Sequence, residues 1–166
     1  SILIETPYII CNNGMYETLA GFCEGGRRVQ IMTNAIESGA NPFGCTDYLN
    51  EKKNILATGS EVFEVSCGQS LHTKTILVDD HISMIGSYNL DLRSTYLDTE
   101  LMLVIDCPEL NQCLRENASV KAEQSRHVLP DGTENEGPDF QGEMPFYKKA
   151  GYFLLRLLTG LFRYLL

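Results

Sequence analysis

Apolar runs and segments of helical periodicity alternate along most of the chain. Runs rich in β-branched and other apolar residues predict strands at residues 1–10, 27–36, 60–66 and 99–106. Helical spacing of the apolar residues predicts helices at residues 14–26, 45–59 and about 109–126. Two further apolar runs, 74–79 and 81–87, flank an acidic turn and predict a β-hairpin. Strands separated by helices indicate an α/β fold, a mixed β-sheet flanked by helices.

Polarity changes twice near the end of the chain and divides it into three parts. The predicted sheet and its helices occupy residues 1–128. Residues 129–146 are rich in Gly, Pro, Asp and Glu and have almost no aliphatic side chains, which predicts an exposed loop or linker. Residues 147–166 are mostly leucines, aromatic residues and a few cations, which predicts a separate C-terminal helix.

The cations of this C-terminal segment are evenly spaced. Lys149, Arg156 and Arg163 lie seven residues apart, so in a helix they share one stripe and leave a broad face of Leu and Phe. Such a basic amphipathic helix is too charged to span a membrane and suits the membrane interface. Docking on its own domain or on a neighbouring one explains the same pattern, and both interpretations stay open.

Length and charge narrow the classes of function. The 166 residues are enough for one domain with a hydrophobic core. The formal net charge of −9 weighs against a nucleic-acid partner, because phosphate affinity comes largely from Lys and Arg. The six cysteines have no zinc-ligand spacing, which favours reduced thiols. Because a strand-like run begins at the first residue, we expect the chain to be a piece of a longer protein.

Two ionisable residues stand at the start of the hairpin. His72 and Lys74 are two apart, so in a strand they point to the same side, where they would be poor core residues. At an anion site, lysine supplies positive charge and histidine supplies a nucleophile or a proton donor. The second hairpin strand ends at Gly86, Ser87 and Asn89, beside this pair. Glycine permits close backbone approach, and the hydroxyl and amide groups can donate to phosphate oxygens.

These residues form the pattern H-x-K-x4-D-x6-G-S-x-N, which resembles the HKD motif of the phospholipase D superfamily. The members of the motif are His72, Lys74, Asp79, Gly86, Ser87 and Asn89. The flanking stretches "NLDLRS" and "DTEL" are similar to those of bacterial cardiolipin synthases and related phosphatidyltransferases. Leu92 and Asp98 depart from the subgroup's usual Pro and Asn, and Asp98 would alter the local field.

The resemblance implies a mechanism that needs no metal and no other cofactor. In the family, two HKD motifs meet. One histidine attacks phosphorus to form a phosphohistidine, while the other protonates the leaving alcohol and later deprotonates the acceptor. This chain has one motif, since His81 lies in the turn and His127 has no lysine two residues later. His72 would be the general acid and base, with Lys74 stabilising the charge on the phosphate.

Two other acidic residues receive roles by the same resemblance. Glu100 matches the family's carboxylate that hydrogen-bonds a catalytic imidazole and fixes its tautomer, as the third member of a triad does. Asp79 lies at the far end of its strand from His72, which favours a structural role in the turn.

We therefore expect the C-terminal catalytic half of a phosphatidyltransferase of cardiolipin synthase type, acting on phospholipids at the bacterial inner membrane or on its cytoplasmic side. Its expected partners are phospholipid substrates, a membrane surface contacted through residues 147–166, and a second HKD half, without which the isolated half would be inactive. Two alternatives stay open: a homodimeric phosphodiesterase or nuclease with one motif per chain, and a non-catalytic interaction domain.

Overall fold

The computed structural model describes residues 1–163, except for the side chains of residues 160–162. Eight strands form one sheet in the order β6-β5-β4-β1-β2-β3-β7-β8. The strands are β1 (Ile2–Glu5), β2 (Val29–Asn34), β3 (Glu61–Val65), β4 (Thr75–Val78), β5 (Ile82–Gly86), β6 (Met102–Asp106), β7 (Ser125–Val128) and β8 (Glu134–Glu136). β1, β2 and β3 are parallel, and all the other pairings are antiparallel. The predicted mixed sheet and the hairpin of β4 and β5 are thus confirmed.

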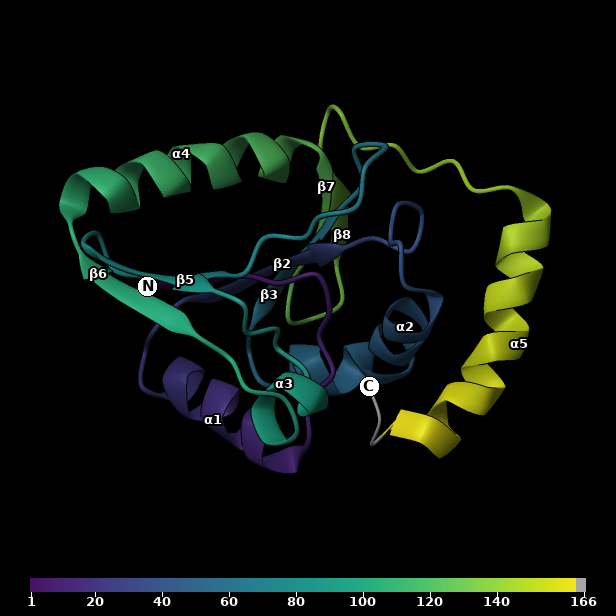
Figure 1. The fold of residues 1–166 in the computed structure, drawn as a ribbon. Coiled ribbons are helices and arrows are strands. Elements are labelled where there is room, and N and C mark those ends of the chain that lie inside the picture. The colour runs from purple at the N-terminus through teal and green to yellow at the C-terminus, as the bar shows by residue number, and fades with distance from the viewer. Residues whose placement is uncertain (164–166) are drawn as a thin grey trace.

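Helices cover both faces of the sheet (Figure 1). They are α1 (Asn13–Glu24), α2 (Pro42–Ala57), α3 (Leu92–Tyr96), α4 (Pro108–Glu123) and α5 (Phe146–Phe162). One core cluster joins Ile4 and Ile31 of the sheet to Leu19 of α1 and Ile55 of α2. A second cluster packs the opposite face of the sheet against α4. Each face of the sheet therefore has its own hydrophobic core.

Several elements differ from the sequence prediction. α2 begins at Pro42 rather than at residue 45, because Asn41 caps it by accepting hydrogen bonds from the next turn and proline fits the first helical position. α4 ends at Glu123, and the following residues form β7, which pairs with β3. The short helix α3, capped by Asp91, was not predicted. Local apolar periodicity carries little signal for such short or edge elements.

The segment 129–146, predicted as an exposed loop or linker, contains the edge strand β8. This strand pairs with β7, and all three of its residues are exposed, so its polar composition gives no strand signal. Beyond it the segment stays tied to the domain, since the Ser66 hydroxyl donates to the Gln141 carbonyl at 2.7 Å. α5 then runs beside α2 (Figure 1). The last three residues of the predicted tail helix, 164–166, lie outside the described residues.

Candidate active site

His72 and Lys74 lie in the segment that joins β3 to β4, just before β4 begins. The Lys74 Nζ is 3.3 Å from His72 Nδ1 and 3.4 Å from His72 Nε2, and it also donates to the His72 carbonyl at 3.3 Å. The imidazole is exposed and the lysine is half-buried. The two side chains therefore lie on the same side of the chain, as their spacing predicted, and an ammonium group touches an accessible imidazole.

Lys74 sits in a partly desolvated and locally acidic environment. Burial lowers the pKa of Lys74 below its ordinary value, while the nearby carboxylates of Glu100 and Asp91 oppose that shift by favouring the charged form. Lys74 can therefore present a positive charge to an anion beside His72.

The end of β5 adjoins this pair. The backbone amide of Gly86 donates to the Lys74 carbonyl at 3.3 Å, so the hairpin register brings the two strand ends together. The Ser87 hydroxyl donates to Glu100, and that hydroxyl in turn accepts a hydrogen bond from the Leu101 amide at 3.0 Å. Ser87 is therefore held by the start of β6 and is not free of partners.

Glu100 is fixed between two serines. Its second carboxylate oxygen accepts from the Ser94 hydroxyl at 2.8 Å, and Ser94 itself belongs to α3. Within the described residues, no hydrogen bond joins Glu100 to His72. The carboxylate instead links β5, α3 and β6 and contributes negative charge near Lys74. Sequence reasoning missed Ser94, and the capping signal Asp91, three residues before it, was the feature that could have indicated a helix there.

Asn89 faces a polar cavity of about 300 Å³ next to the site. The cavity is lined by Tyr8, Ile10, Asn41, Asn89, Asp91, Arg93, Ser94 and Asp98. The side-chain carbonyl oxygen of Asn89 is buried without a hydrogen-bond partner. A buried acceptor without a partner is costly in a finished core and suits a site that receives a ligand donor. Asp98, the departure expected to alter the local field, is paired with Arg93 at 2.8 Å.

Asn34 holds the segment that carries His72, and sequence reasoning did not select it. Its buried amide group donates to the carbonyls of Pro7 and Leu71 at 3.1 and 2.9 Å, and its side-chain oxygen accepts from the Leu71 amide at 2.7 Å. Leu71 directly precedes His72. A polar residue at the end of the buried strand β2 was the available sequence signal.

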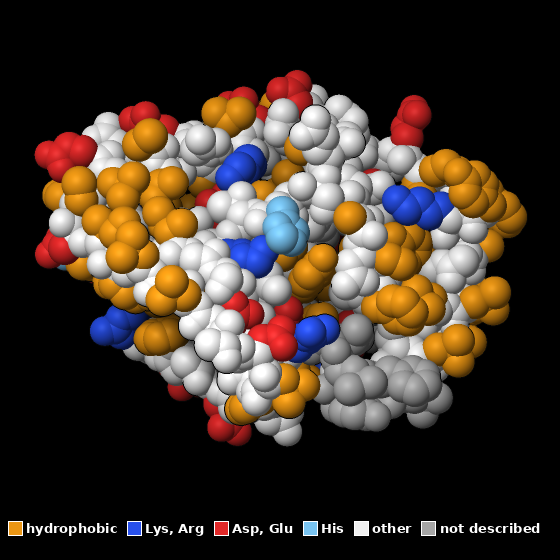
Figure 2. Space-filling model, in the orientation of Figure 1, with side chains coloured by type: hydrophobic (Ala, Val, Ile, Leu, Met, Phe, Trp, Pro, Cys, Tyr) orange, Lys and Arg blue, Asp and Glu red, His pale blue; other side chains and the backbone are white. Residues whose placement is uncertain are grey.

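Polar groups gather in the middle of the face that carries the site. Figure 2 shows a histidine with basic and acidic side chains around it, between two areas of hydrophobic side chains. One area lies over the part of the molecule that contains β6, where Leu101, Leu103 and Val104 are each more than half exposed. The other lies over α5. An exposed polar centre between apolar areas is typical of a binding surface.

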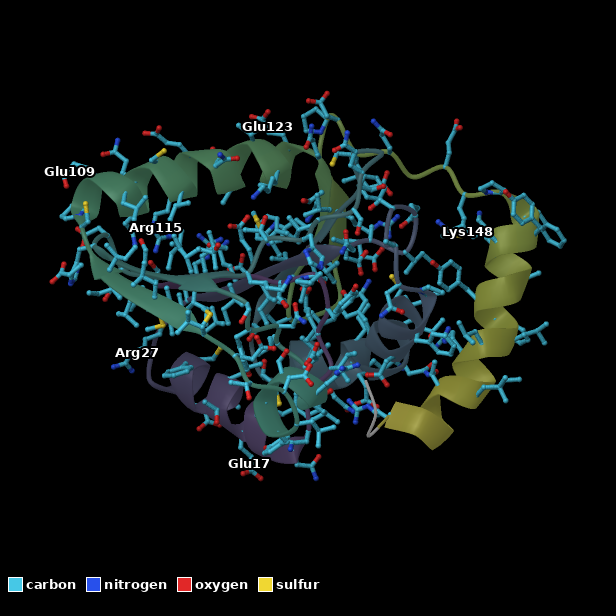
Figure 3. All side chains as sticks on the ribbon, in the orientation of Figure 1. Glu17, Arg27, Glu109, Arg115, Glu123 and Lys148 are labelled. Carbon is cyan, nitrogen blue, oxygen red and sulfur yellow. The ribbon has the colours of Figure 1, made fainter. Side chains whose placement is uncertain are left out.

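Asp79 lies outside this group. It follows β4 at the end away from His72, in the turn to β5, and its φ of 49° is in the left-handed region, which Asp tolerates. Its carbonyl accepts from Arg115 of α4, which points from the helix toward the sheet in Figure 3. The structure thus places Asp79 among groups that fix the turn.

The other two histidines are also remote from the site. His81 pairs with Asp80 at 3.0 Å in the β4–β5 turn. His127 stacks on Phe63 with ring centroids 4.1 Å apart and pairs with Glu61, near the opposite edge of the sheet. Within residues 1–163, no three His, Cys, Asp or Glu side chains are arranged to hold a metal ion.

Replacement of Asn34 by leucine is expected to destabilise the protein by about 2–4 kcal/mol, because the buried backbone groups of Pro7 and Leu71 lose their partners. Denaturant unfolding measures this change in the free energy of unfolding. The matched control is Asn54→Leu on the exposed surface of α2, where the change should stay within about 0.5 kcal/mol. Equal stability of the two variants would contradict the role given to Asn34.

Gly86→Ala is a second expected stability defect. A Cβ at this position would lie 2.0 Å from the Leu101 carbonyl oxygen and 2.6 Å from the Met102 sulfur, so β6 would have to move. The expected cost is about 1–3 kcal/mol, measured by thermal or denaturant unfolding. Gly21→Ala in α1, where a Cβ meets nothing within 4 Å, is the control and should leave stability equal or higher. If Gly86→Ala is as stable as wild type, β6 moves without a measurable cost in the free energy of unfolding, and this prediction is wrong.

Comparison with known proteins agrees with this geometry. The family described as "Cardiolipin synthase, PLD-like domain" matches residues 1–119. Cardiolipin synthase A of Buchnera aphidicola is 33% identical over 106 residues, which cover 63% of this chain and 21% of that protein. The chain spans less than a third of the length of the curated relatives it matches.

Two solved structures share the fold. The phospholipase D family member Nuc from Salmonella typhimurium superposes with a TM-score of 0.63 at 21% identity, over 77% of this chain and 81% of that one. Phosphatidylserine synthase from Haemophilus influenzae superposes with a TM-score of 0.67 at 18% identity, over 99% of this chain and 41% of that one. The same fold therefore makes up most of one of these proteins and less than half of the other.

Proposed function

The chain belongs to the family of cardiolipin synthase, PLD-like domains, and from this premise we propose that it supplies the C-terminal catalytic half of a phosphatidyltransferase. The observation that carries the proposal is the contact between the exposed His72 imidazole and the Lys74 ammonium group. Phosphodiester transfer needs a proton donor beside a fixed positive charge, and this pair provides both.

The proposed reaction has two steps. A histidine of a second half attacks phosphorus, the bond to the leaving alcohol breaks, and His72 donates its proton to the departing oxygen. His72 then takes the proton of the acceptor alcohol, whose oxygen attacks phosphorus, so that the P–N bond of the phosphohistidine breaks and the histidine of the second half is released. Lys74 and Asn89 contact the phosphate oxygens in both steps. Glu100 holds Ser87 at the edge of the phosphate site. Water in place of the alcohol gives hydrolysis.

A second half is expected to pack over the face that carries the site. Leu101, just before the edge strand β6, and Leu103 on that strand have exposed side chains, and the Leu101 amide contacts Ser87. Burial of such an apolar area on association contributes favourably, at about 25 cal/mol per Å². This packing would bring the missing histidine to the phosphate.

Membrane association is part of the same proposal. Within the described part of the chain, no helix has the length and apolar character needed to cross a membrane. α5 carries exposed Phe153 and Leu157, which suit the interface of a bilayer. The enzyme would then act on phospholipids at a membrane surface.

The activity test uses vesicles of phosphatidylglycerol and follows diphosphatidylglycerol and free glycerol by mass spectrometry. Appearance of both products supports transfer, and free phosphatidic acid would indicate hydrolysis. Absence of all these products when the chain is assembled with a second HKD half would contradict the proposal.

A homodimeric phosphodiesterase is the second candidate. It is favoured by one observation, that the fold accounts for 81% of the Nuc chain, so a protein of this size occurs in the superfamily. The homodimeric phosphodiesterase would be favoured if a dimer cleaves a soluble phosphodiester, such as bis(4-nitrophenyl) phosphate, and leaves phospholipid intact. A protein that turns over neither substrate would correspond to a non-catalytic interaction domain.

A further inference from the structure

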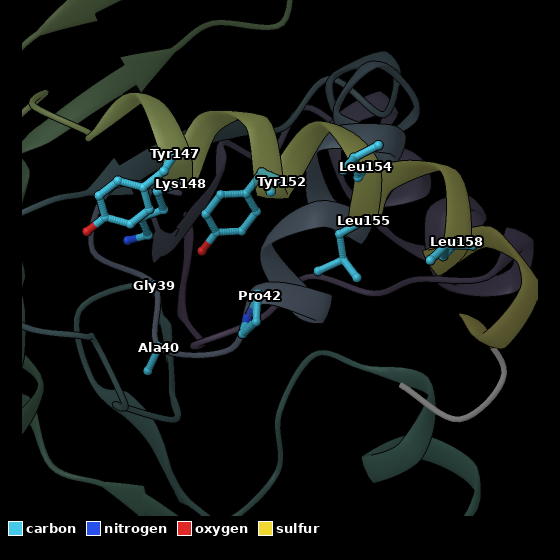
Figure 4. A pocket seen from close by; sticks show the side chains of 10 residues that line it. Gly39, Ala40, Pro42, Tyr147, Lys148, Tyr152, Leu154, Leu155 and Leu158 are labelled. Atoms are coloured by element: carbon cyan, nitrogen blue, oxygen red, sulfur yellow. The ribbon is translucent and has the colours of Figure 1, made fainter.

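An apolar groove of about 570 Å³ runs between α5 and the loop that precedes α2 (Figure 4). One side is formed by Gly39 and Ala40 of the loop and by Pro42, the first residue of α2. The helix side is formed by Tyr147, Lys148, Gly151, Tyr152, Leu154, Leu155 and Leu158. Lys148 is the one charged residue of this lining, so the groove is almost entirely hydrophobic.

The groove exists because α5 docks through its polar stripe. Arg163 pairs with the buried Asp47 at 2.9 Å, and Arg156 donates to the Asn50 side chain of α2 at 2.8 Å. The sequence left open whether this stripe meets a membrane or docks on the domain, and in the structure both arginines contact α2. Two arginine–polar contacts hold the helix and leave its apolar side chains uncovered.

The groove borders the candidate active site. Pro42 lines the groove, while its neighbour Asn41 lines the polar cavity that Asn89 faces. On the same loop, the Ala40 amide donates to the Ser70 hydroxyl at 3.4 Å, two residues before His72. The polar cavity and the apolar groove thus adjoin each other at residues 41 and 42, close to the segment that carries His72.

A lipid fits this arrangement better than a protein helix. The wall is apolar along its length, and Lys148 at one end keeps hydrogen-bonding capacity, because it donates to the Glu37 carbonyl at 2.9 Å and an ammonium group has three protons. An amphiphile with an anionic headgroup matches both features. We infer that the groove binds one acyl chain of the phospholipid whose phosphate reacts at His72. The inference rests on the proposed function for the identity of that phospholipid.

Gly151 offers a variant that fills the groove. A Cβ at this position meets nothing within 4 Å, so Gly151→Phe adds a ring on the groove side while leaving the helix backbone in place. Gly21→Phe in α1 is the matched control, because that helical glycine is equally open and exposed. The probe is a long-chain lysophosphatidylglycerol with a fluorophore at the end of its acyl chain, and a short-chain analogue serves for comparison.

Binding of the probe to the intact protein is measured by fluorescence anisotropy below the micelle concentration. Gly151→Phe is expected to raise the Kd for the long-chain probe by about tenfold or more, with no change in Gly21→Phe or for the short-chain analogue. His72→Asn should bind the probe like wild type, so loss of transfer and loss of acyl binding are separate results. Circular dichroism checks that the Gly151→Phe variant is folded, and Gly151→Ile is the smaller replacement.

Three results would overturn the inference. The first is wild-type affinity in folded Gly151→Phe and Gly151→Ile. The second is equal affinity of the wild-type protein for long-chain and short-chain probes. The third is a dimer, seen by sedimentation, that Gly151→Phe dissociates without any effect on probe binding, since the groove would then hold a second copy of the chain.

Discussion

With the second HKD half present, His72→Asn is expected to lower the rate of phospholipid transfer by on the order of 10²–10⁴-fold while leaving the fold intact. The reason is that asparagine cannot carry the proton between the alcohol oxygens, although its amide has a similar size and polarity. The side chain is exposed and contacts mainly Lys74, so its loss removes no core packing. Product formation from phosphatidylglycerol vesicles and the unfolding curve are measured on the same preparation.

The control for this variant is His81→Asn. His81 lies in the β4–β5 turn and pairs with Asp80, away from the site, so transfer should stay at the wild-type rate. Unchanged transfer in His72→Asn would remove His72 from the reaction. An equal loss in both variants would point to a general loss of structure, and the unfolding curves would reveal it.

Lys74→Gln is expected to reduce transfer by on the order of 10²–10³-fold, the usual effect of removing one group that stabilises transition-state charge. The pH dependence gives a second readout. Because burial lowers the pKa of Lys74, the lysine loses its proton at a lower pH than a free lysine does, so wild-type activity should fall early on the alkaline side. Glutamine does not titrate, so the residual activity of Lys74→Gln should not show this decrease at alkaline pH.

Lys53→Gln is the matched control for Lys74. Lys53 is exposed on α2, and its replacement changes the net charge of the protein by the same amount. It should alter neither the rate nor the pH profile. If the two lysine variants behave alike, the effect of Lys74 would be one of overall charge and not of its place beside His72.

The central strands, the hairpin and the motif residues of the site could be predicted from the sequence, because the patterns that indicate them are local. Apolar runs indicate the central strands, and the turn between them indicates the hairpin of β4 and β5. The membership of the superfamily, predicted from the spacing of His72, Lys74 and Asn89, is confirmed by the family match over residues 1–119. The roles of these residues in catalysis remain predictions.

The remaining features depend on contacts between distant parts of the chain. Asn34 hydrogen-bonds Leu71, 37 residues away, and nothing in the local sequence indicates that contact. Gly86 was expected to permit close backbone approach, and the structure shows that the approaching group is the Leu101 carbonyl. The neighbour of the α5 cations was left open between a membrane and the domain itself, because periodicity defines a stripe without defining which neighbour it meets.

The central claim is that this chain contributes one histidine to a site that needs two. The most direct test measures the specific transfer activity of the chain against its state of association, with sedimentation and product analysis on the same samples. The account predicts no turnover by the monomer, and activity only when a second half with its own H-x-K pair is bound. A monodisperse monomer that transfers phospholipid at full rate, and loses this activity in His72→Asn, would show that one histidine is sufficient.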